Sequence, residues 1–521
     1  MTPTVRDHLL ARAQDDAPGL LFEDASWSWA EVVGDSCVRS AVMDALLPAG
    51  APRHVGVLLD NVPEFLFLLG AAALGGQVVV GLNPTRRGPA LAADVARADV
   101  SLVLADATYA GLLEGVGVPV IAVDGPEWAA LLEAHADAPA PAVEVAPDTL
   151  MMLIFTSGTS GEPKAVNVTH AKVAHPGLLL SERFGLGPDD VAYLSMPLFH
   201  SNAVMAGWAP ALAAGATIAL ARRFSASGFL PDVRRYGATY ANYVGKPLTY
   251  VMATPERPDD ADNPLRLVFG NEANDRDIEG FARRFGCTVV DSYSSTENAV
   301  IVQRVPGMPP GSLGRPLEGV KVLDPVTMAE TPDAEFGPDG TLLNAEAATG
   351  ELVNTAGAGA FAGYYRDPDA EAERMRGGMY WSGDLAYRDA EGFVYFAGRT
   401  ADWLRVDGEN LAAAPVERIL LRHPAVVEAA VYAVPDESVG DQVMAALVTR
   451  EPLEPAGFEE FLAAQPDLSP KAWPRYVRLV GSLPRTATNK VLKRRLAADG
   501  PVAGDGTLWV REPRGRSYSP A

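Results

Sequence analysis

The sequence predicts an α/β protein with a large N-terminal domain of layered α/β sheets and a smaller C-terminal α+β domain. The chain has 521 residues, more than one hydrophobic core usually serves. Short apolar runs alternate with amphipathic segments through its first three quarters, a pattern typical of strands joined by helices. This pattern changes near Gly398, and the remainder has the size of a separate domain. We therefore expect domains at 1–398 and 399–521.

The elements of the first domain follow this alternation. Val55–Leu59 is an apolar run typical of a buried strand, and Glu64–Leu74 follows it as a helix. Gln77–Leu82 and Ser101–Ala105 are predicted strands, with a helix at Pro89–Ala98 whose first residue is a proline. Later segments repeat the pattern, with strands at Thr217–Ala221, Tyr240–Val244 and Leu267–Phe269 and a helix at Ala226–Tyr236.

The second domain is predicted to mix helices and strands. Its expected helices are Pro415–His423, Glu454–Gln465 and the basic Asn489–Ala497, and its expected strands are Val426–Val434 and Val443–Val448. No internal repeat is evident in either domain.

The composition excludes some partners. A formal charge of −23 argues against nucleic acid, which would require a basic face. Apolar stretches such as Leu66–Leu74 fall short of the roughly 20 residues of a membrane span, and the N-terminus lacks the apolar core of a signal peptide. Cys37 and Cys287 are far apart and are predicted to be core residues. We expect a soluble cytoplasmic protein, and a homodimer is left open.

The segment Leu153–Lys164 is the most informative. An apolar strand leads into two glycines, four hydroxyl side chains and a lysine. Glycines let several backbone N–H groups converge on an anion, and the lysine adds a positive charge. The spacing differs from the Walker motif. We expect a phosphate-binding loop made of Thr156, Ser157, Gly158, Thr159, Ser160, Gly161 and Lys164.

This loop resembles the Thr-Ser-Gly-Thr-Thr-Gly-x-Pro-Lys motif of the adenylate-forming superfamily, which includes acyl-CoA synthetases, peptide-synthetase adenylation domains and luciferases. Ser160 stands for the second threonine of the Thr-Thr pair. The other superfamily motifs follow in order, so the resemblance covers nearly the whole chain. They are similar to Asp291–Glu297, Tyr380–Leu385, Gly398–Asn410 and Leu483–Lys490.

The resemblance implies an ATP-dependent, AMP-forming ligase. Such an enzyme activates an acid as a mixed anhydride with AMP, releases pyrophosphate, and transfers the acid to a nucleophile that is by default CoA. It also implies that Lys164 contacts the β- and γ-phosphates, Thr296 the α-phosphate, and Glu297 a Mg²⁺ ion, a cation that prefers such oxygens. The nucleoside would be held by Asn271, Glu272, Ala273, Ser292, Tyr293, Ser294, Asp384 and Arg399.

Lys490 is expected to be the catalytic lysine, stabilising charge on the carboxylate and the α-phosphate. In the superfamily the small domain rotates between the two half-reactions, so a mobile C-terminal domain is implied, with a hinge near 399–402. The pivot position is Ala401. A small residue there resembles the branch of fatty-acid-transport proteins and very-long-chain acyl-CoA synthetases.

The acid pocket is expected to be formed by His200, Asn242, Tyr243, Lys246 and Asn298. The branch usually has glycine where this chain has Asn298. Because an asparagine would narrow the passage and an unpaired buried amide costs about 1–3 kcal/mol, the sequence favours a short, polar or aromatic acid. An alternative is an ATP-dependent diazotase that adenylates nitrite for attack by an aryl amine. A non-enzymatic nucleotide-binding scaffold is less favoured, because Lys164, Glu297, Asp384, Arg399 and Lys490 are all retained.

Overall fold

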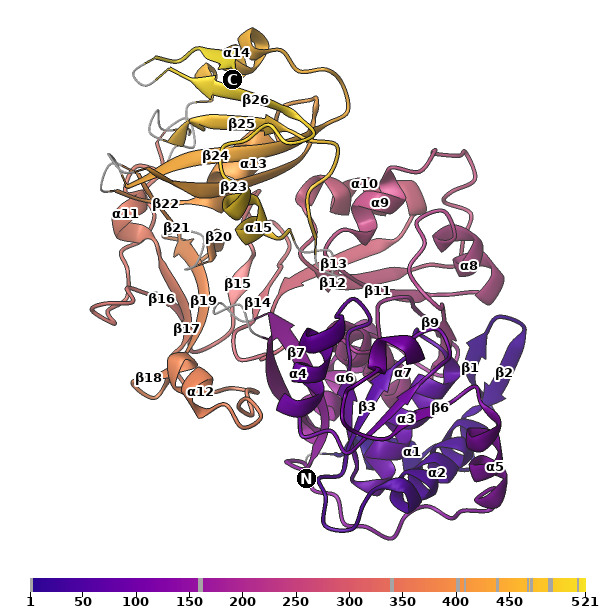
Figure 1. The fold of residues 1–521 in the computed structure, drawn as a ribbon. Coiled ribbons are helices and arrows are strands. Elements are labelled where there is room, and N and C mark those ends of the chain that lie inside the picture. Colours follow the sequence, from indigo (N-terminus) through magenta and orange to yellow (C-terminus); the bar gives the residue numbers. More distant parts are fainter. Residues whose placement is uncertain are drawn as a thin grey trace. The chain divides into compact units, whose positions relative to one another are not determined.

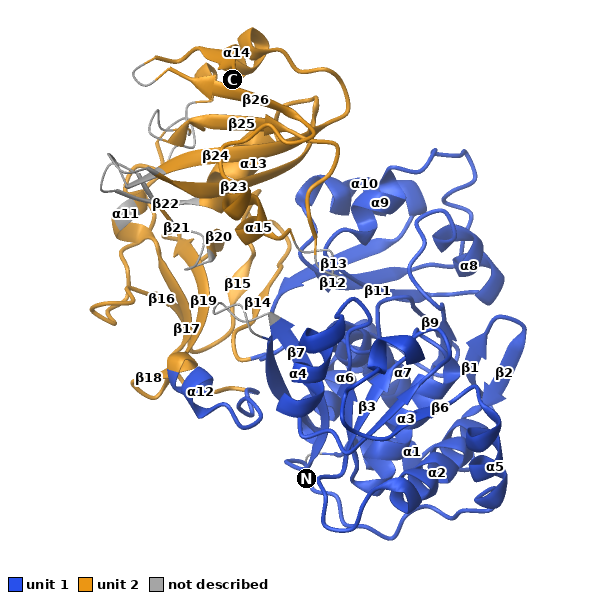
Figure 2. Cartoon of the chain, in the orientation of Figure 1, with its two compact units in different colours: residues 1–298, 360–372 blue, residues 299–359, 373–521 orange. Residues whose placement is uncertain are grey.

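A computed structural model describes residues 3–157, 163–337, 342–399, 403–406, 409–436, 440–465, 468, 472–485, 491–512 and 515–521 (Figure 1). The chain divides into two compact units (Figure 2). Unit 1 comprises residues 1–298 and 360–372, and unit 2 comprises residues 299–359 and 373–521. The mixed α/β class is confirmed, with the larger part at the N-terminus. The boundary at 399 and the hinge at 399–402 stay predictions, and 400–402 lie outside the described residues.

Unit 1 contains two largely parallel sheets. One has the order β6-β5-β3-β4-β7-β8, in which only the β7–β8 pair is antiparallel among the described pairings. Its strands are β3 (His54–Leu58), β4 (Val78–Gly81), β5 (Leu102–Ala105), β6 (Val120–Ala122), β7 (Leu150–Ser157) and β8 (Pro163–Thr169).

The second sheet of unit 1 has the order β13-β12-β11-β9-β10-β1-β2. Its described pairings are parallel except for that of β1 with β2. The strands are β1 (Pro18–Phe22), β2 (Ala25–Ser28), β9 (Val191–Leu194), β10 (Thr217–Leu220), β11 (Tyr240–Val244), β12 (Leu267–Asn271) and β13 (Thr288–Tyr293).

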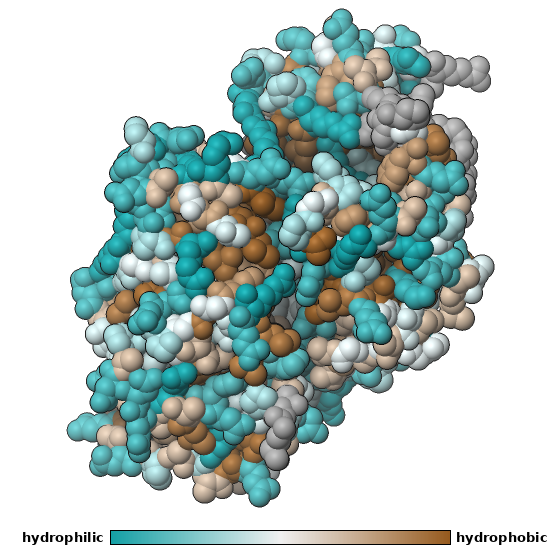
Figure 3. All heavy atoms as spheres, turned by 180° about the vertical axis from the view of Figure 1, so that it is seen from behind, coloured by the Kyte–Doolittle hydropathy of each residue, from teal (hydrophilic) through white to brown (hydrophobic). Residues whose placement is uncertain are grey.

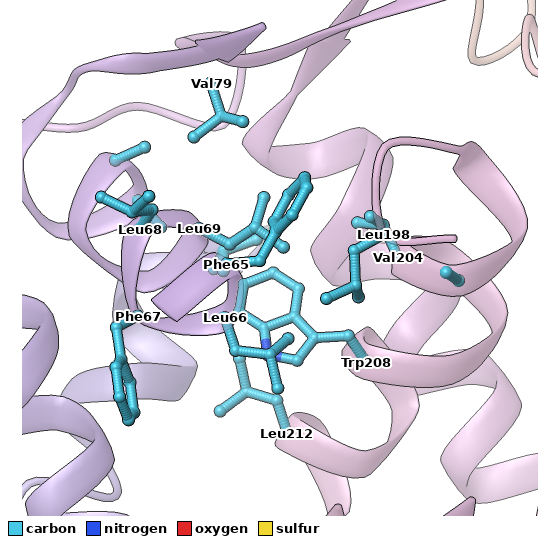
Figure 4. Close-up of a cluster of buried hydrophobic side chains, with 14 of the residues drawn as sticks. Phe65, Leu66, Phe67, Leu68, Leu69, Val79, Leu198, Val204, Trp208 and Leu212 are labelled. Atoms are coloured by element: carbon cyan, nitrogen blue, oxygen red, sulfur yellow. The ribbon is translucent and has the colours of Figure 1, made fainter. Parts of the chain in front are cut away.

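Helices cover these sheets. They are α1 (Val5–Leu10), α2 (Trp29–Leu46), α3 (Pro63–Gly75), α4 (Gly88–Arg97), η1 (Ala110–Leu113), α5 (Pro126–Ala134), α6 (His170–Phe184), η2 (Ala203–Trp208), α7 (Ala209–Ala214), α8 (Phe229–Tyr236), α9 (Pro247–Met252) and α10 (Asp275–Phe285). α3 is apolar on all sides, and every residue from Phe65 to Gly75 is buried. Figure 4 shows its side chains packed with Trp208 and Leu212. This hydrophobic cluster takes in residues of both sheets and forms the core of the unit.

Arg284, near the C-terminal end of α10, anchors that helix through a buried ion pair with Asp260. Arg284 and Asp260 lie 2.6 Å apart, and their side chains are 4% and 3% exposed. The Arg284 guanidinium also donates to the carbonyls of Val251, Thr254 and Pro255. The charge is therefore well paired, because several acceptors surround it.

Unit 2 holds two further sheets and a two-stranded ribbon. The ribbon is β14 (Val302–Gln303) with β15 (Arg315–Pro316). One sheet has the order β16-β17-β19-β18, with β20 on β19, and the other has the order β22-β21-β24-β25-β26-β27, with β23 on β24. Their strands are β16 (Val320–Leu323), β17 (Gly350–Asn354), β18 (Met375–Arg376), β19 (Met379–Arg388), β20 (Val394–Arg399), β21 (Trp403–Val406), β22 (Glu409–Ala412), β23 (Val426–Asp436), β24 (Gly440–Thr449), β25 (Tyr476–Leu479), β26 (Thr507–Arg511) and β27 (Tyr518–Pro520).

The helices of unit 2 are short. They are α11 (Ala345–Ala348), α13 (Ala413–Leu420), α14 (Pro455–Ala463) and α15 (Lys493–Asp499), and α12 (Pro368–Arg374) lies where the chain passes from one unit to the other. The helices and strands predicted for both domains are present, with ends that shift by a few residues. For example, α8 begins at Phe229 and not at Ala226, and α13 ends at Leu420 and not at His423.

No helix in the described part of the chain is long and apolar enough to span a bilayer. On the face shown in Figure 3, hydrophilic residues surround hydrophobic ones. Single exposed apolar residues such as Val326 are ordinary on protein surfaces.

His170 makes the stability of unit 1 sensitive to acid. It begins α6, is fully buried, and neither ring nitrogen has a hydrogen-bond partner among the described residues. Burial lowers the pKa of His170 to about 4. In the unfolded chain the ring takes up a proton near pH 6.5. The free energy of unfolding should therefore fall as pH drops below 6.5, by roughly 2 kcal/mol from this residue between pH 7 and pH 5.

Thermal unfolding of the wild type and of His170→Leu at both pH values measures this effect. The variant should lose less stability on acidification than the wild type. Equal losses in the two proteins would contradict the assignment.

Candidate active site

Two residues predicted to hold the nucleotide, Asn271 and Ser292, lie at the carboxyl ends of β12 and β13. Asn271 pairs in register with Ser292 across the β12–β13 ladder. Its amide nitrogen donates to the Ser292 carbonyl at 2.6 Å and to the Ser292 hydroxyl at 3.0 Å. Ligands of parallel α/β sheets commonly bind at this edge. The position fits the predicted nucleotide role of both residues, which stays a prediction.

A chain of amides joins these strands to the segment before η2. The Asn242 amide donates to Asn202 Oδ1 at 2.7 Å, and Asn202 donates to the Tyr243 carbonyl at 2.9 Å. Asn242 and Tyr243 are only 4% and 2% exposed. Both residues are buried and bonded to neighbouring segments of the protein. Their direct contact with the acid stays a prediction.

Asp291 connects β11 with the predicted adenine wall. Its Oδ2 atom accepts hydrogen bonds from the Tyr243 hydroxyl at 2.6 Å and from the Ala273 backbone at 3.1 Å. Glu272 adopts a left-handed backbone, with φ of 68°. Asp291 has no predicted role of its own. Its position directly before Ser292 and Tyr293, at the end of a strand, is the signal that could have indicated one.

The predicted α-phosphate ligand lies beside the η2 segment. The hydroxyls of Thr296 and Ser201 are 3.0 Å apart. The half-buried His200 ring lies 4.3 Å from the Phe199 ring, and η2 itself is a π-helix, a form frequent at functional sites. The structure thus brings His200 and Thr296 into one region. Lys246 lies at the N-cap of α9 and is partly exposed.

The charged residues Glu297 and Lys164 share a neighbour, Tyr364. The Tyr364 hydroxyl donates to Glu297 Oε1 at 2.8 Å. Lys164 Nζ lies 5.4 Å from the centre of the Tyr364 ring, within the range of a cation–π contact. All three side chains are buried. Sequence patterns gave no reason to select Tyr364.

Lys172 is a second residue that the sequence analysis missed. It lies in the first turn of α6, is 3% exposed, and its ammonium has no hydrogen-bond partner among the described residues. Burial lowers the pKa of Lys172 to about 8, and the charge of Glu297 partly offsets that effect. A positive charge therefore acts on the Glu297 carboxylate from the side of α6.

The Glu297 carboxylate accepts one hydrogen bond among the described residues. Tyr364 is its hydrogen-bond partner within the described residues, and this bond uses one carboxylate oxygen. No group of three or more His, Cys, Asp and Glu side chains that could hold a metal occurs in the described ranges. The Mg²⁺ role of Glu297 stays a prediction, in which phosphate oxygens would be further ligands, as is common for Mg²⁺.

In unit 2, Asp384 and Arg399 are register partners across β19 and β20. Gly383, which precedes Asp384, has φ of 75°, and its N–H donates to Glu351 at 2.6 Å. A positive φ of this size favours glycine, because residues with a Cβ rarely adopt it. This turn fixes the backbone at Asp384, but the ribose role of Asp384 and Arg399 stays a prediction.

Several predicted residues cannot be placed. Gly158, Thr159, Ser160, Gly161 and Lys490 lie outside the described residues, and the side chains of Ser157 and Arg399 are not described. Thr156 is half-buried in β7, opposite Lys164 in the β7–β8 register. The two ends of the predicted loop therefore lie side by side, and the role of the loop itself stays a prediction.

Comparisons with known proteins show the family. Residues 9–365 match the family described as AMP-binding enzyme, and residues 415–490 match the AMP-binding enzyme C-terminal domain. Over 98% of its length the chain is 54% identical to the medium/long-chain-fatty-acid–CoA ligase FadD17 of Mycobacterium marinum, covering 99% of it. Over 95% of its length it is 49% identical to a steroid-22-oyl-CoA synthetase of Rhodococcus jostii, covering 90% of it.

The fold is similar to that of a solved structure, ATP-bound MatB from Rhodopseudomonas palustris. The TM-score is 0.82 at 24% identity, and the match covers 95% of this chain and 99% of that one. This likeness supports the fold and adds nothing on the substrate.

The names of these relatives do not support the prediction of a small acid. Those at 54% and 49% identity are named for fatty acids and a steroid acid, and neither name supports a diazotase. The structure gives Asn298 a second explanation. Its backbone has φ of 53°, and its amide oxygen accepts a hydrogen bond from Ser294 at 2.8 Å. Asparagine tolerates this conformation better than other residues with a Cβ, so the backbone alone can account for it, and its place in the acid pocket stays a prediction.

If the backbone conformation explains Asn298, two substitutions there should differ in their effect on activity. Asn298→Gly should leave the preference among acids of different length within about threefold of wild type, because glycine adopts positive φ freely. Asn298→Val should lower activity, because a β-branched residue at positive φ stores about 1–3 kcal/mol of strain. Pyrophosphate release with acids of increasing length measures both. A marked gain in activity with longer acids in Asn298→Gly would support the hypothesis that Asn298 narrows the acid passage.

Proposed function

This chain is a member of the AMP-binding enzyme family, and from that premise we propose that it joins a carboxylic acid with a large hydrophobic part to CoA. The acid would be a medium- or long-chain fatty acid or a steroid side-chain acid. The observation that carries this proposal is the 54% identity over nearly the whole chain to a fatty-acid–CoA ligase. The steroid-acid synthetase supports the same class of bulky, apolar substrate.

In the first half-reaction, a carboxylate oxygen of the acid attacks the α-phosphorus of ATP. The bond between the α-phosphorus and the bridging oxygen breaks, and pyrophosphate leaves with the electron pair. Both reactants are anions, so the site must neutralise charge and align them. Lys164 supplies a buried positive charge for the phosphates. The Thr296 hydroxyl, oriented by Ser201, would donate to the α-phosphate.

Mg²⁺ when bound would neutralise phosphate charge and favour pyrophosphate as a leaving group. Glu297 is the residue that would hold it. In the second half-reaction, the sulfur of CoA attacks the carbonyl carbon of the acyl adenylate, the thiol proton is lost, and AMP leaves. Asp384 in unit 2 would accept hydrogen bonds from the ribose hydroxyls, which suits a carboxylate because it is an acceptor only.

A substrate panel tests this proposal. Pyrophosphate release and CoA-thioester formation are measured with saturated fatty acids from acetate to palmitate, with a steroid side-chain acid, and with benzoate. Nitrite with an aryl amine serves as the negative control. We expect CoA-dependent turnover with the longer fatty acids or the steroid acid, at least tenfold above acetate and benzoate. Preference for acetate or benzoate, or turnover without CoA, would overturn the proposal.

A further inference from the structure

Tyr364 lies in a short segment that returns to unit 1 after the chain has entered unit 2. There it pairs with β8 on the side away from β7. Tyr365 donates its N–H to the Ala165 carbonyl at 2.8 Å, and Asn167 donates to the Gly363 carbonyl at 3.1 Å. Tyr364 itself forms an antiparallel bridge with Val166. The segment therefore acts as one more strand beside the strand that carries Lys164.

This pairing sets where the phenol ring points. Side chains of a strand alternate between faces, so Lys164 and Val166 project to the same face of β8. Tyr364, opposite Val166, projects to that face as well. Lys164 is therefore its diagonal neighbour across the strands, and aromatic and long side chains can reach each other at such positions. The 5.4 Å from Lys164 Nζ to the ring centre follows from this register. The backbone thus fixes the ring beneath the ammonium.

The hydroxyl end of the same side chain reaches a different element. It donates to Glu297, 67 residues earlier in the chain, through a buried hydrogen bond of 2.8 Å. Within the described residues no other hydrogen bond holds that carboxylate. Lys172 acts on Glu297 by charge, which attracts the carboxylate but does not orient it. The direction of the carboxylate therefore depends on the Tyr364 hydroxyl.

We propose that Tyr364 is a positioning residue that holds Glu297 by its hydroxyl and Lys164 by its ring, in the arrangement that Mg²⁺ and the phosphates of ATP require. This inference rests on the proposed function, because it takes ATP as the ligand of that pair. Two chemical groups of one side chain serve the two charged residues. Their contributions can therefore be separated by substitution.

Tyr364→Phe removes the hydroxyl and keeps the ring, whereas Tyr364→Leu removes both. Tyr365→Phe is a matched control, because the Tyr365 hydroxyl also donates to a carboxylate, that of Asp99, at 3.0 Å. Calorimetric titration with ATP, with and without Mg²⁺, gives the affinity of each protein apart from turnover. Thermal unfolding of each variant reports whether it is folded.

Mg²⁺ should raise the ATP affinity of Tyr364→Phe by a factor roughly 10-fold smaller than in wild type. Loss of a residue that orients a metal ligand costs about 10–100-fold in metal affinity. ATP affinity without Mg²⁺ should stay unchanged. Tyr364→Leu should weaken ATP binding in both conditions, and Tyr365→Phe should match wild type in both. A Tyr364→Phe protein that matches Tyr365→Phe would overturn the inference.

A double-mutant cycle keeps the inference testable if Tyr364→Phe also loses stability. In a Glu297→Gln background, Tyr364→Phe should have no further effect on the Mg²⁺-dependent gain, because the hydroxyl acts through that carboxylate. Additive losses would contradict this. Acyl-CoA formation by the wild type tests the proposed function separately, so failure of the one is distinguishable from failure of the other.

Discussion

Replacing Lys490 by alanine should reduce pyrophosphate release about 100- to 1000-fold, the usual effect of removing one group that stabilises transition-state charge. Adenylation brings a carboxylate onto a phosphate, so a positive charge at the reacting oxygens lowers the barrier. Thioester formation from preformed acyl adenylate should be nearly unaffected, because a carboxylate no longer has to approach a phosphate in that step. The two half-reactions are measured separately, by pyrophosphate release and by CoA-thioester formation from synthetic acyl adenylate.

Lys493→Ala is the matched control for Lys490→Ala. Lys493 is three residues further along, and its ammonium pairs with Glu417 at 2.9 Å within unit 2. This variant should keep adenylation close to wild type. If Lys490→Ala slowed both half-reactions equally, or if Lys493→Ala matched it, the catalytic assignment would fail.

Replacing Arg284 by methionine should destabilise the fold by about 3–5 kcal/mol, the cost of leaving a buried charge without its partner. The residue left behind is Asp260, whose side chain is 3% exposed. The carbonyls of Val251, Thr254 and Pro255 lose a donor at the same time. Denaturant unfolding, followed by circular dichroism, measures the loss.

Two further variants show that the effect comes from burial. Arg222→Met breaks an ion pair with Glu23 whose side chains are 48% and 61% exposed, and it should cost less than about 1 kcal/mol. Arg284→Met combined with Asp260→Leu should recover part of the loss, because no isolated charge remains. A double variant as unstable as Arg284→Met alone would show that the lost carbonyl contacts dominate.

The elements of the fold could be predicted because their signals are local. Continuous apolar runs such as Val55–Leu59 and turns rich in glycine and proline mark strands and their ends. The predicted nucleotide residues could be grouped for a similar reason, since strand ends of a parallel sheet meet at one edge. Asn271 and Ser292 follow that rule and are directly bonded.

The remaining parts of the site depend on contacts across long stretches of sequence. Tyr364 reaches Glu297 across 67 residues, and no periodicity predicts such a pairing. Lys172 looks like an ordinary residue in the first turn of a helix, and its burial depends on tertiary packing. Side-chain size alone does not account for Asn298, because its positive φ and the hydrogen bond from Ser294 to its amide oxygen also favour asparagine there.

The return of residues 360–372 to unit 1 has a consequence for biosynthesis. Everything else in that unit has been translated by residue 298, yet the strand beside β8 and the hydrogen bond to Glu297 await a segment made more than sixty residues later. On the ribosome, Lys164 and Glu297 would lack their contacts with Tyr364 until that segment emerges. Closing so long a loop is a slow event in folding. A truncated chain that ends at residue 298 would keep both sheets of unit 1 but lack Tyr364.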